Sequence, residues 1–275
     1  MSQENAGSRV FDLDAYLRRL QLDGARELAA VHRAHVAAIP FENLDPHRGA
    51  PVSLELEDLQ RKLVHDARGG YCFEHNLLLK AALEALGASV EEMLARVRLG
   101  ADPGSIRPRT HLVLRVLDEN TSWLADVGFG AGTLLEPLPF EVGAEGQCAG
   151  WRFRLCEDGD ELVVRSAGAD GAWLDLYGFV PQPVPHVDIE TSNWFVSTHP
   201  RSPFRAGLVV CTQDAAGART RLSDWDGLTL VRQTPAGTAS EAVSRERIPQ
   251  LLADEFGLPG FALDADGRVV PSAAR

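Results

Sequence analysis

Residues 68–76 read RGGYCFEHN, so a cysteine, Cys72, stands two residues after a pair of glycines. Apolar residues then recur at helical spacing as far as Leu86, and Gly87 is a typical helix stop. The pattern therefore predicts a helix from position 71 or 72 to 86, with the cysteine in its first turn. A buried structural cysteine needs neither the glycines nor the helix start, whereas a reactive cysteine uses both.

The sequence before this stretch is predicted to be helical. Asp12 is placed to cap a first helix. A second helix covers 25–35, because the chain must leave the helical region before Pro40. Ser53 is placed to cap a third helix that runs to Leu63.

The sequence after this helix is predicted to be mostly antiparallel strands. Residues 111–117 and 122–127 flank a turn at 118–121 and read as a hairpin. Other strand-like runs cover 151–156, 161–166, 172–177, 206–212, 220–224 and 228–233. Between and after them come a proline-rich connector at 180–186, a helix at 189–197 and a helix at 247–256. Helices first and strands second is an α+β pattern, and the strand spacing is typical of a small antiparallel sheet or barrel.

The composition excludes several classes of function. A net charge of −12 argues against nucleic acid as a partner, because phosphates require a basic surface. No apolar run approaches the roughly 20 residues of a membrane span. The N-terminus lacks the basic start and apolar segment of a signal peptide. We therefore expect a cytoplasmic protein with no nucleic-acid or membrane partner.

The four cysteines show no metal-site or disulfide pattern. Cys72, Cys148, Cys156 and Cys211 lack CxxC spacing, so no metal is expected. Cys148 is predicted to lie in a loop, and Cys156 and Cys211 lie in strand-like runs, which fits small buried side chains. Cys72 differs, because a helix N-terminus and an adjacent imidazolium both favour the thiolate. The pattern alone leaves a structural and a catalytic role for Cys72 equally open.

Two histidines compete as the base beside Cys72. His75 lies one turn along the same helix, where side chains seldom meet in hydrogen-bond geometry. His111 begins an apolar strand and Asp126 ends the next, so a hairpin places them at the same end of adjacent strands. Asp126 would then orient the imidazole as the third member of a triad. The alternative is an exposed histidine and an unrelated turn aspartate.

Two further features adjoin these candidates. Glycines alternate at Gly128, Gly130 and Gly132, which lets a backbone approach a ligand, although a flexible strand exit gives the same pattern. Arg68 and Glu74 flank the cysteine, and a structural ion pair is favoured over a chemical role.

Taken in order, RGGYCFEHN, RTH at 109–111 and DVGFG at 126–130 resemble the arylamine N-acetyltransferase family. The resemblance continues in flanking segments and so covers most of the chain. These segments are HRAHVAAIPFENLD at 32–45, TLLEPLPF at 133–140, NWFVSTHPRSPF at 193–204 and LADEFGL at 252–258.

The resemblance implies a fold and a role for each matched residue. Cys72 matches the acetylated nucleophile, His111 the base and Asp126 the third triad member of a papain-like or transglutaminase-like core. The implied units are a helical bundle, an antiparallel β-barrel, and a connecting helix with an α/β lid, at 1–88, 89–186 and 187–275.

The resemblance also implies ping-pong acetyl transfer. Acetyl-CoA is the donor substrate, no cofactor is tightly bound, and the acceptor is an arylamine, arylhydrazine or arylhydroxylamine. The implied CoA contacts are Thr110, Gly128, Phe129, Gly130 and Phe204. The implied aromatic walls of the acceptor site are Phe41, Phe129 and Phe204. We expect a monomer or a homodimer.

Three other functions use the same residues. The first is an amide synthase that closes a macrolactam on a carrier-bound chain with the same triad. The second is a hydrolase or transglutaminase, against which the flanking matches argue. The third is a non-catalytic binding protein, which an intact triad disfavours.

Overall fold

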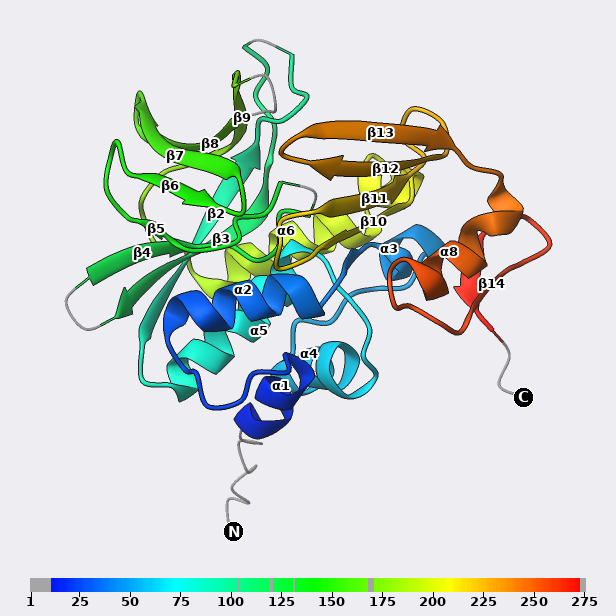
Figure 1. Ribbon diagram of the computed structural model, residues 1–275, viewed down its shortest axis with the longest axis horizontal. Coiled ribbons are helices and arrows are strands. Elements are labelled where there is room, and N and C mark those ends of the chain that lie inside the picture. The colour runs from blue at the N-terminus through cyan, green and yellow to red at the C-terminus, as the bar shows by residue number, and fades with distance from the viewer. Residues whose placement is uncertain (1–10, 103, 119–120, 131, 168–170, 273–275) are drawn as a thin grey trace.

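The computed structural model describes residues 11–102, 104–118, 121–130, 132–167 and 171–272 (Figure 1). N-terminal helices lie against a strongly curved sheet, and a second sheet with short helices follows (Figure 1). The expected α+β fold, with helices first and strands second, is confirmed. The division into units at residues 88 and 186 stays a prediction.

The N-terminal part is helical, as expected, with different bounds. Asp12 caps the first helix, since its side chain accepts from the Ala15 N–H at 2.8 Å. Ser53 is not a cap: it accepts from the Glu55 N–H outside the helix, and Glu55 precedes the first helical residue. A short helix that contains Pro46 was not anticipated. The elements are α1 Leu13–Arg19, α2 Leu28–Ala38, α3 Leu44–Arg48, α4 Leu56–Gln60, a π-helical turn Arg61–His65 and α5 Cys72–Ala85.

Within the described residues, eight antiparallel strands form a near-barrel in the order β5-β4-β3-β2-β9-β8-β7-β6. The edges β5 and β6 come close, since a Cβ at Gly146 would collide with the Leu138 side chain. The predicted hairpin is confirmed as the pair β3–β4. Cys148 is the last residue of β6, so the prediction that it lies in a loop was wrong. The strands are β2 Ser89–Val97, β3 Arg109–Asp118, β4 Thr121–Ala125, β5 Leu138–Pro139, β6 Glu145–Cys148, β7 Trp151–Asp158, β8 Glu161–Ala167 and β9 Trp173–Phe179.

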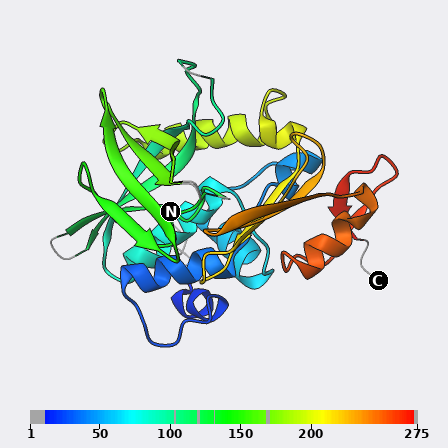
Figure 2. The ribbon, with the colours of Figure 1, turned by 45° about the horizontal axis from the view of Figure 1, so that its top comes forward.

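The C-terminal sheet takes its first strand from the N-terminal part. Strand β1, Phe41–Glu42, pairs with β10, and the order is β1-β10-β11-β12-β13 among the described residues. Figure 2 shows α6 running from the near-barrel toward this sheet. The remaining elements are α6 His186–Thr198, α7 Pro203–Ala206, β10 Val209–Gln213, β11 Arg219–Ser223, β12 Thr229–Thr234, β13 Gly237–Ala242, a 3-10 turn Arg245–Arg247, α8 Ile248–Asp254, β14 Phe261–Leu263 and β15 Val269–Pro271.

Side-chain alternation places the two faces of β10 in different cores. Val209 and Cys211 join the large cluster formed with the helices and the near-barrel. Val210 joins the smaller cluster under α8. Because side chains alternate along a strand, the odd-numbered residues of β10 face the near-barrel.

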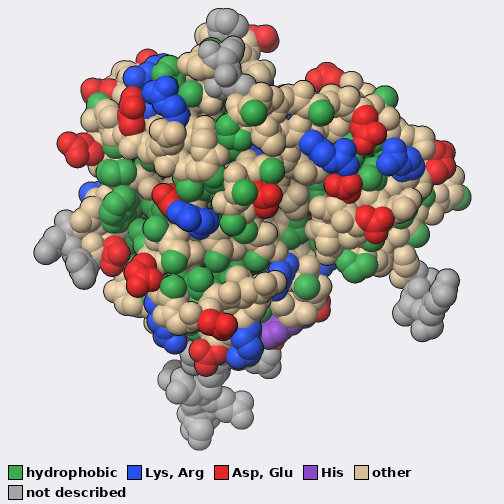
Figure 3. Space-filling model, in the orientation of Figure 1, with side chains coloured by type: hydrophobic (Ala, Val, Ile, Leu, Met, Phe, Trp, Pro, Cys, Tyr) green, Lys and Arg blue, Asp and Glu red, His purple; other side chains and the backbone are tan. Residues whose placement is uncertain are grey.

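The surface carries charges of both signs. On the face in Figure 3, acidic and basic side chains are interspersed. Exposed ion pairs include Arg232 with Glu255 at 2.6 Å. Among the helices that the structure describes, none has both the length and the apolar character needed to cross a bilayer.

A buried hydrogen-bond chain ties α1, α2 and α5 to β1. The His75 Nε2–H donates to the Pro40 carbonyl at 3.2 Å, which leaves Nδ1 to accept from His35 Nε2 at 2.9 Å. His35 Nδ1 then accepts from the Tyr16 hydroxyl at 2.8 Å. The carbonyl can only accept, so His75 Nε2 carries a proton. Burial lowers the pKa of both histidines, so both imidazoles are neutral near pH 7 and the Nδ1 atom of each accepts. Burial lowers the pKa of His75 to about 4, despite its bond to Pro40.

This chain makes the fold sensitive to acid. The unfolded state binds a proton at His75 near pH 6.5 and the folded state only near pH 4, so stability falls as the pH falls between these values. Over this range the wild type should lose about 3 kcal/mol more free energy of unfolding than His75→Gln. Urea unfolding at several pH values measures this difference. The half-exposed control His186→Gln should keep the wild-type slope, and parallel curves for wild type and His75→Gln would contradict the assignment.

Candidate active site

Cys72 is the first residue of α5 and is 3% exposed. The glycines before it let the chain pass close to β1: a Cβ at Gly69 would collide with the Pro40 carbonyl oxygen, and Gly70 bridges to Phe41. The Cys72 thiol lies 3.6 Å from the Thr110 carbonyl oxygen on β3. The helix start that the sequence predicted therefore lies against the beginning of β3.

His111 and Asp126 meet as the hairpin predicted. His111 Nε2 lies 2.8 Å from Asp126 Oδ2, and both side chains are buried. Burial lowers the pKa of His111, but the Asp126 carboxylate more than offsets this effect. Cys72, within hydrogen-bonding reach, adds to the rise, and the pKa is raised to about 10. Since Nε2 faces Asp126, Nδ1 is the ring nitrogen left for the sulfur.

The Asp126 carboxylate is held by donors from two parts of the chain. Its Oδ1 accepts from Asn76 Nδ2 at 3.0 Å and from the Gly128 N–H at 2.9 Å. Burial raises the pKa of Asp126, but the charge and hydrogen bond of His111, with these donors, give a net lowering. Asn76 lies one turn after Cys72 and also bonds the backbone of Leu112 and Val127. One side chain therefore joins α5 to β3 and to the segment that follows β4.

The glycine loop after β4 packs directly on the cysteine. A Cβ at Gly128 would lie 2.7 Å from the Cys72 Cα, so only glycine fits there without movement. Gly130 has a φ of +79°, a backbone conformation that favours glycine, and a Cβ there would lie 3.4 Å from the Phe41 ring. Close packing therefore explains why glycine stands at these two positions, whether or not the loop also contacts a ligand.

Aromatic rings form two groups around the cysteine. Phe129 packs at 5.1 Å from both His111 and Tyr177. Phe41 and Phe204 lie 6.0 Å apart, which brings β1 together with α7. Of the three phenylalanines singled out in the sequence, Phe129 therefore packs on His111, and Phe204 packs on Tyr71, the residue before Cys72.

Arg68 and Glu74 each form an ion pair with a different partner. Arg68 binds Glu42 at 2.6 Å, and Glu74 binds Lys62 at 2.7 Å. Glu74 also accepts from the Tyr71 N–H at 3.0 Å, which fixes the residue before the cysteine. Their structural role is supported, and the partners come from outside the motif.

Two contacts within this site were not predicted from the sequence. His32 Nε2 accepts from the Asp126 N–H at 3.2 Å, and the Tyr177 ring packs at a tilt against His111, with 4.8 Å between the ring centroids. Both residues lie far from their partners in the sequence and belong to no short motif with them, so these contacts become visible only in the folded structure. His75, the competing base, instead bonds Pro40 and His35. Within the part of the chain that the structure describes, no group of three His, Cys, Asp or Glu side chains could hold a metal ion.

Comparison with known proteins agrees with this geometry. A family model described as N-acetyltransferase matches residues 25–262. The arylamine N-acetyltransferase of Mycolicibacterium smegmatis is 44% identical over 217 residues, covering 75% of this chain and 78% of that protein. This chain belongs to the arylamine N-acetyltransferase family.

Other members of the arylamine N-acetyltransferase family are similar over nearly the whole chain. The Mycobacterium tuberculosis enzyme is 40% identical over 261 residues, 90% of each protein. The structure of the Mycobacterium marinum enzyme in complex with CoA matches with a TM-score of 0.84 and 38% identity. It covers 90% of this chain and 93% of that one. The family and fold expected from the sequence motifs are therefore confirmed.

The contact of Gly128 with Cys72 predicts that this glycine is needed for an intact site. Gly128→Ala should lower the free energy of unfolding by about 1–3 kcal/mol, because the added methyl group overpacks the interface. It should also change the rate at which iodoacetamide alkylates Cys72, measured by intact mass. The matched control is Gly237→Ala, where a Cβ meets no atom within 4 Å. Equal stability and equal alkylation of the two variants would refute the prediction.

Proposed function

We propose that this chain moves an acetyl group from acetyl-CoA to an arylamine, arylhydrazine or arylhydroxylamine through an acetyl-Cys72 intermediate. The observation that carries the proposal is the convergence of Cys72, from α5, with the buried His111–Asp126 pair of the near-barrel. Membership of the arylamine N-acetyltransferase family supports the substrate classes.

In the first half-reaction the thiolate of Cys72 attacks the thioester carbonyl of acetyl-CoA. The raised pKa of His111 keeps the imidazole protonated at neutral pH, so the thiolate is paired with a cation. N–H groups of the first turn of α5 stabilise the developing oxyanion. The C–S bond to CoA then breaks, and the CoA sulfur takes the proton from His111.

In the second half-reaction the neutral amine attacks the acetyl group on Cys72. His111, now deprotonated, takes the proton from the amine nitrogen, and the Cys72 thiolate leaves. The imidazolium–thiolate pair is thereby restored. Arylamines suit this step because their nitrogen is uncharged at neutral pH, and exchange of one thioester for another conserves the energy for it.

The remaining predicted contacts are part of the same proposal. The Thr110 carbonyl lies beside the sulfur, Gly128 borders the Cys72 backbone, and Gly130 borders the Phe41 ring. We assign the CoA contacts to Thr110, Gly128, Phe129, Gly130 and Phe204, and the acceptor walls to Phe41, Phe129 and Phe204. The monomeric or homodimeric state, the cytoplasmic location and the absence of nucleic-acid partners stay predictions from the sequence.

The covalent intermediate can be observed directly. Mixing the protein with acetyl-CoA alone should add one acetyl group by intact-mass measurement, and peptide mapping should place it on Cys72. Cys72→Ala should not be acetylated and should not turn over. Cys156→Ala, a half-buried cysteine on β7, should behave as the wild type. Acetylation of a lysine instead, or turnover by Cys72→Ala, would refute the mechanism. Acetylation of Cys72 by free acetyl-CoA would also separate this activity from carrier-dependent amide synthesis.

Asp126 should be needed for the chemistry beyond its part in folding. Asp126→Asn removes the carboxylate that raises the pKa of His111, so that pKa should fall and acylation should slow by about 10³–10⁴-fold. Stopped-flow release of CoA measures the rate, and NMR titration of the imidazole measures the pKa. A folded Asp126→Asn protein with an unchanged rate and an unchanged imidazole titration would show that the carboxylate is only structural.

A further inference from the structure

His32 of α2 binds both ends of the glycine loop, which is described at residues 126–130 and 132–135. Its Nε2 accepts from the Asp126 N–H at 3.2 Å, and its Nδ1 lies 3.3 Å from the Leu135 carbonyl oxygen. The side chain is fully buried. One imidazole therefore bridges the two ends of the segment that carries the triad carboxylate and the glycines packed against Cys72 and Phe41.

The two backbone partners fix the protonation of the His32 ring. A carbonyl oxygen can only accept, so Nδ1 carries a proton, and an amide N–H can only donate, so Nε2 carries a lone pair. Burial lowers the pKa of His32 to about 4, although the charge of Asp126 raises it. At neutral pH the ring is therefore neutral and satisfies both backbone groups. An imidazolium would instead place a second N–H against the Asp126 amide.

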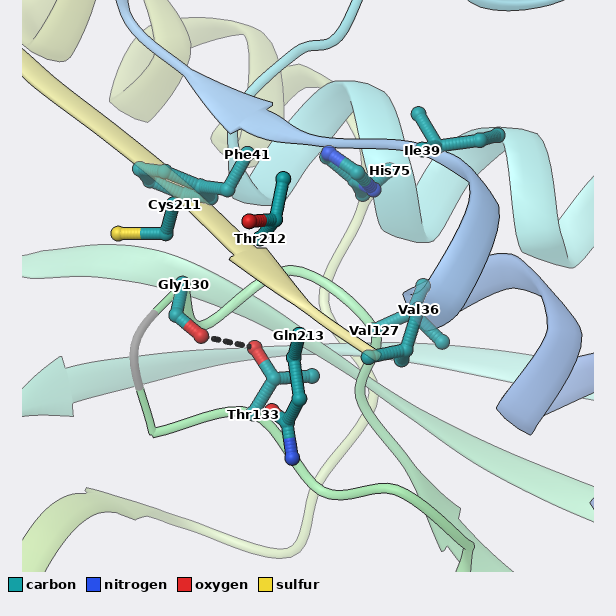
Figure 4. Close-up of a pocket in the computed structure, with 10 residues that line it drawn as sticks. All are labelled: Val36, Ile39, Phe41, His75, Val127, Gly130, Thr133, Cys211, Thr212 and Gln213. Atoms are coloured by element: carbon teal, nitrogen blue, oxygen red, sulfur yellow. Dashed lines mark hydrogen bonds between the residues drawn. The ribbon is translucent and has the colours of Figure 1, made fainter. Parts of the chain in front are cut away.

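Apolar residues of α2 face the same loop. Val36, one turn after His32, lines a small pocket together with Val127, Gly130 and Thr133 of the loop (Figure 4). Within the loop, the Thr133 hydroxyl donates to the Gly130 carbonyl at 2.8 Å, drawn as the dashed line in Figure 4. The helix therefore faces the body of the loop with an apolar side chain, and His32 binds the two ends.

Two buried histidines flank Asp126, and they have opposite protonation states at neutral pH. His111 faces the carboxylate at 2.8 Å, and its pKa is raised to about 10. His32 instead meets the backbone N–H of the same residue and stays neutral. Because His32 carries no charge, it does not compete with His111 for the carboxylate charge. It therefore holds the backbone of Asp126 without weakening the effect of the carboxylate on the base.

We propose that His32 is a positioning residue for the triad, which acts through Asp126 by holding the backbone from which the carboxylate reaches His111. The bond to the Leu135 carbonyl closes the loop and fixes the orientation of the His32 ring. A shift of about 1 Å at a reacting group slows a reaction about 100-fold, so a small movement of this backbone matters. The effect of His32 on the rate of acetyl transfer rests on the proposed function, whereas its effect on His111 does not.

Two substitutions separate the two bonds of His32. The amide of glutamine reaches the position of Nε2, so His32→Gln keeps an acceptor for the Asp126 N–H. The amide of asparagine reaches only the position of Nδ1, so His32→Asn keeps a donor for Leu135 and loses the bond to Asp126. NMR titration of the His111 imidazole should show proton binding about 10-fold weaker in His32→Asn and close to the wild type in His32→Gln. Single-turnover release of CoA should be about 10–100-fold slower in His32→Asn and close to the wild type in His32→Gln.

His35→Asn is the matched control. His35 lies one turn along the same helix and is equally buried, but it bonds Tyr16 and His75 instead of Asp126. This control should melt below the wild type, as His32→Asn should, and leave both the His111 titration and the rate of CoA release unchanged. A wild-type titration in His32→Asn would overturn the proposal, and so would equal losses in His32→Asn and either of the other two variants.

If His32→Asn does not fold, the wild type supplies a second measurement. Nitrogen NMR at neutral pH should find the proton of His32 on Nδ1, and a coupling through the hydrogen bond between Nε2 and the Asp126 N–H. A proton on Nε2 would overturn the proposal. If the wild type releases no CoA from acetyl-CoA, the proposed function fails, and the His111 titration still decides the role of His32.

Discussion

The structure depends on the contact between the first turn of α5 and the edge of the near-barrel. Asn76 donates to Asp126 and to the Leu112 carbonyl, and accepts from the Val127 N–H. Gly128 packs against the Cys72 backbone without a side chain between them. The hydrogen bonds of Asn76, which lies one turn after the cysteine, hold the helix in place relative to the hairpin. Cys72 and His111 therefore keep their separation although they lie 39 positions apart in the chain.

Electrostatics explain why Asp126 is buried here at an acceptable cost. Removing a carboxylate from water costs several kcal/mol. Hydrogen bonds to a charged group contribute about 1.5–3 kcal/mol each, and Asp126 accepts three, from His111, Asn76 and Gly128. The charge therefore survives in the interior, and the same burial strengthens its effect on the imidazole. A single arrangement of donors stabilises the fold and, through Asp126, raises the pKa of His111.

Local signals in the sequence were enough for part of this arrangement. The glycine pair and the apolar spacing predicted α5, and the turn at 118–121 predicted the hairpin, because both elements are formed by neighbours in the chain. Strand β2 and helix α3 were not predicted, since their stability comes from distant partners. His32 and Tyr177 were missed for the same reason: they reach the site across the packed core.

Strand β1 joins the N-terminal helices to the C-terminal sheet. Phe41 pairs with Cys211 of β10, its backbone follows Pro40 in the buried histidine chain, and its ring packs against Phe204 of α7. A two-residue strand has little stability of its own. Its position is therefore set by the histidine chain on one side and by β10 on the other.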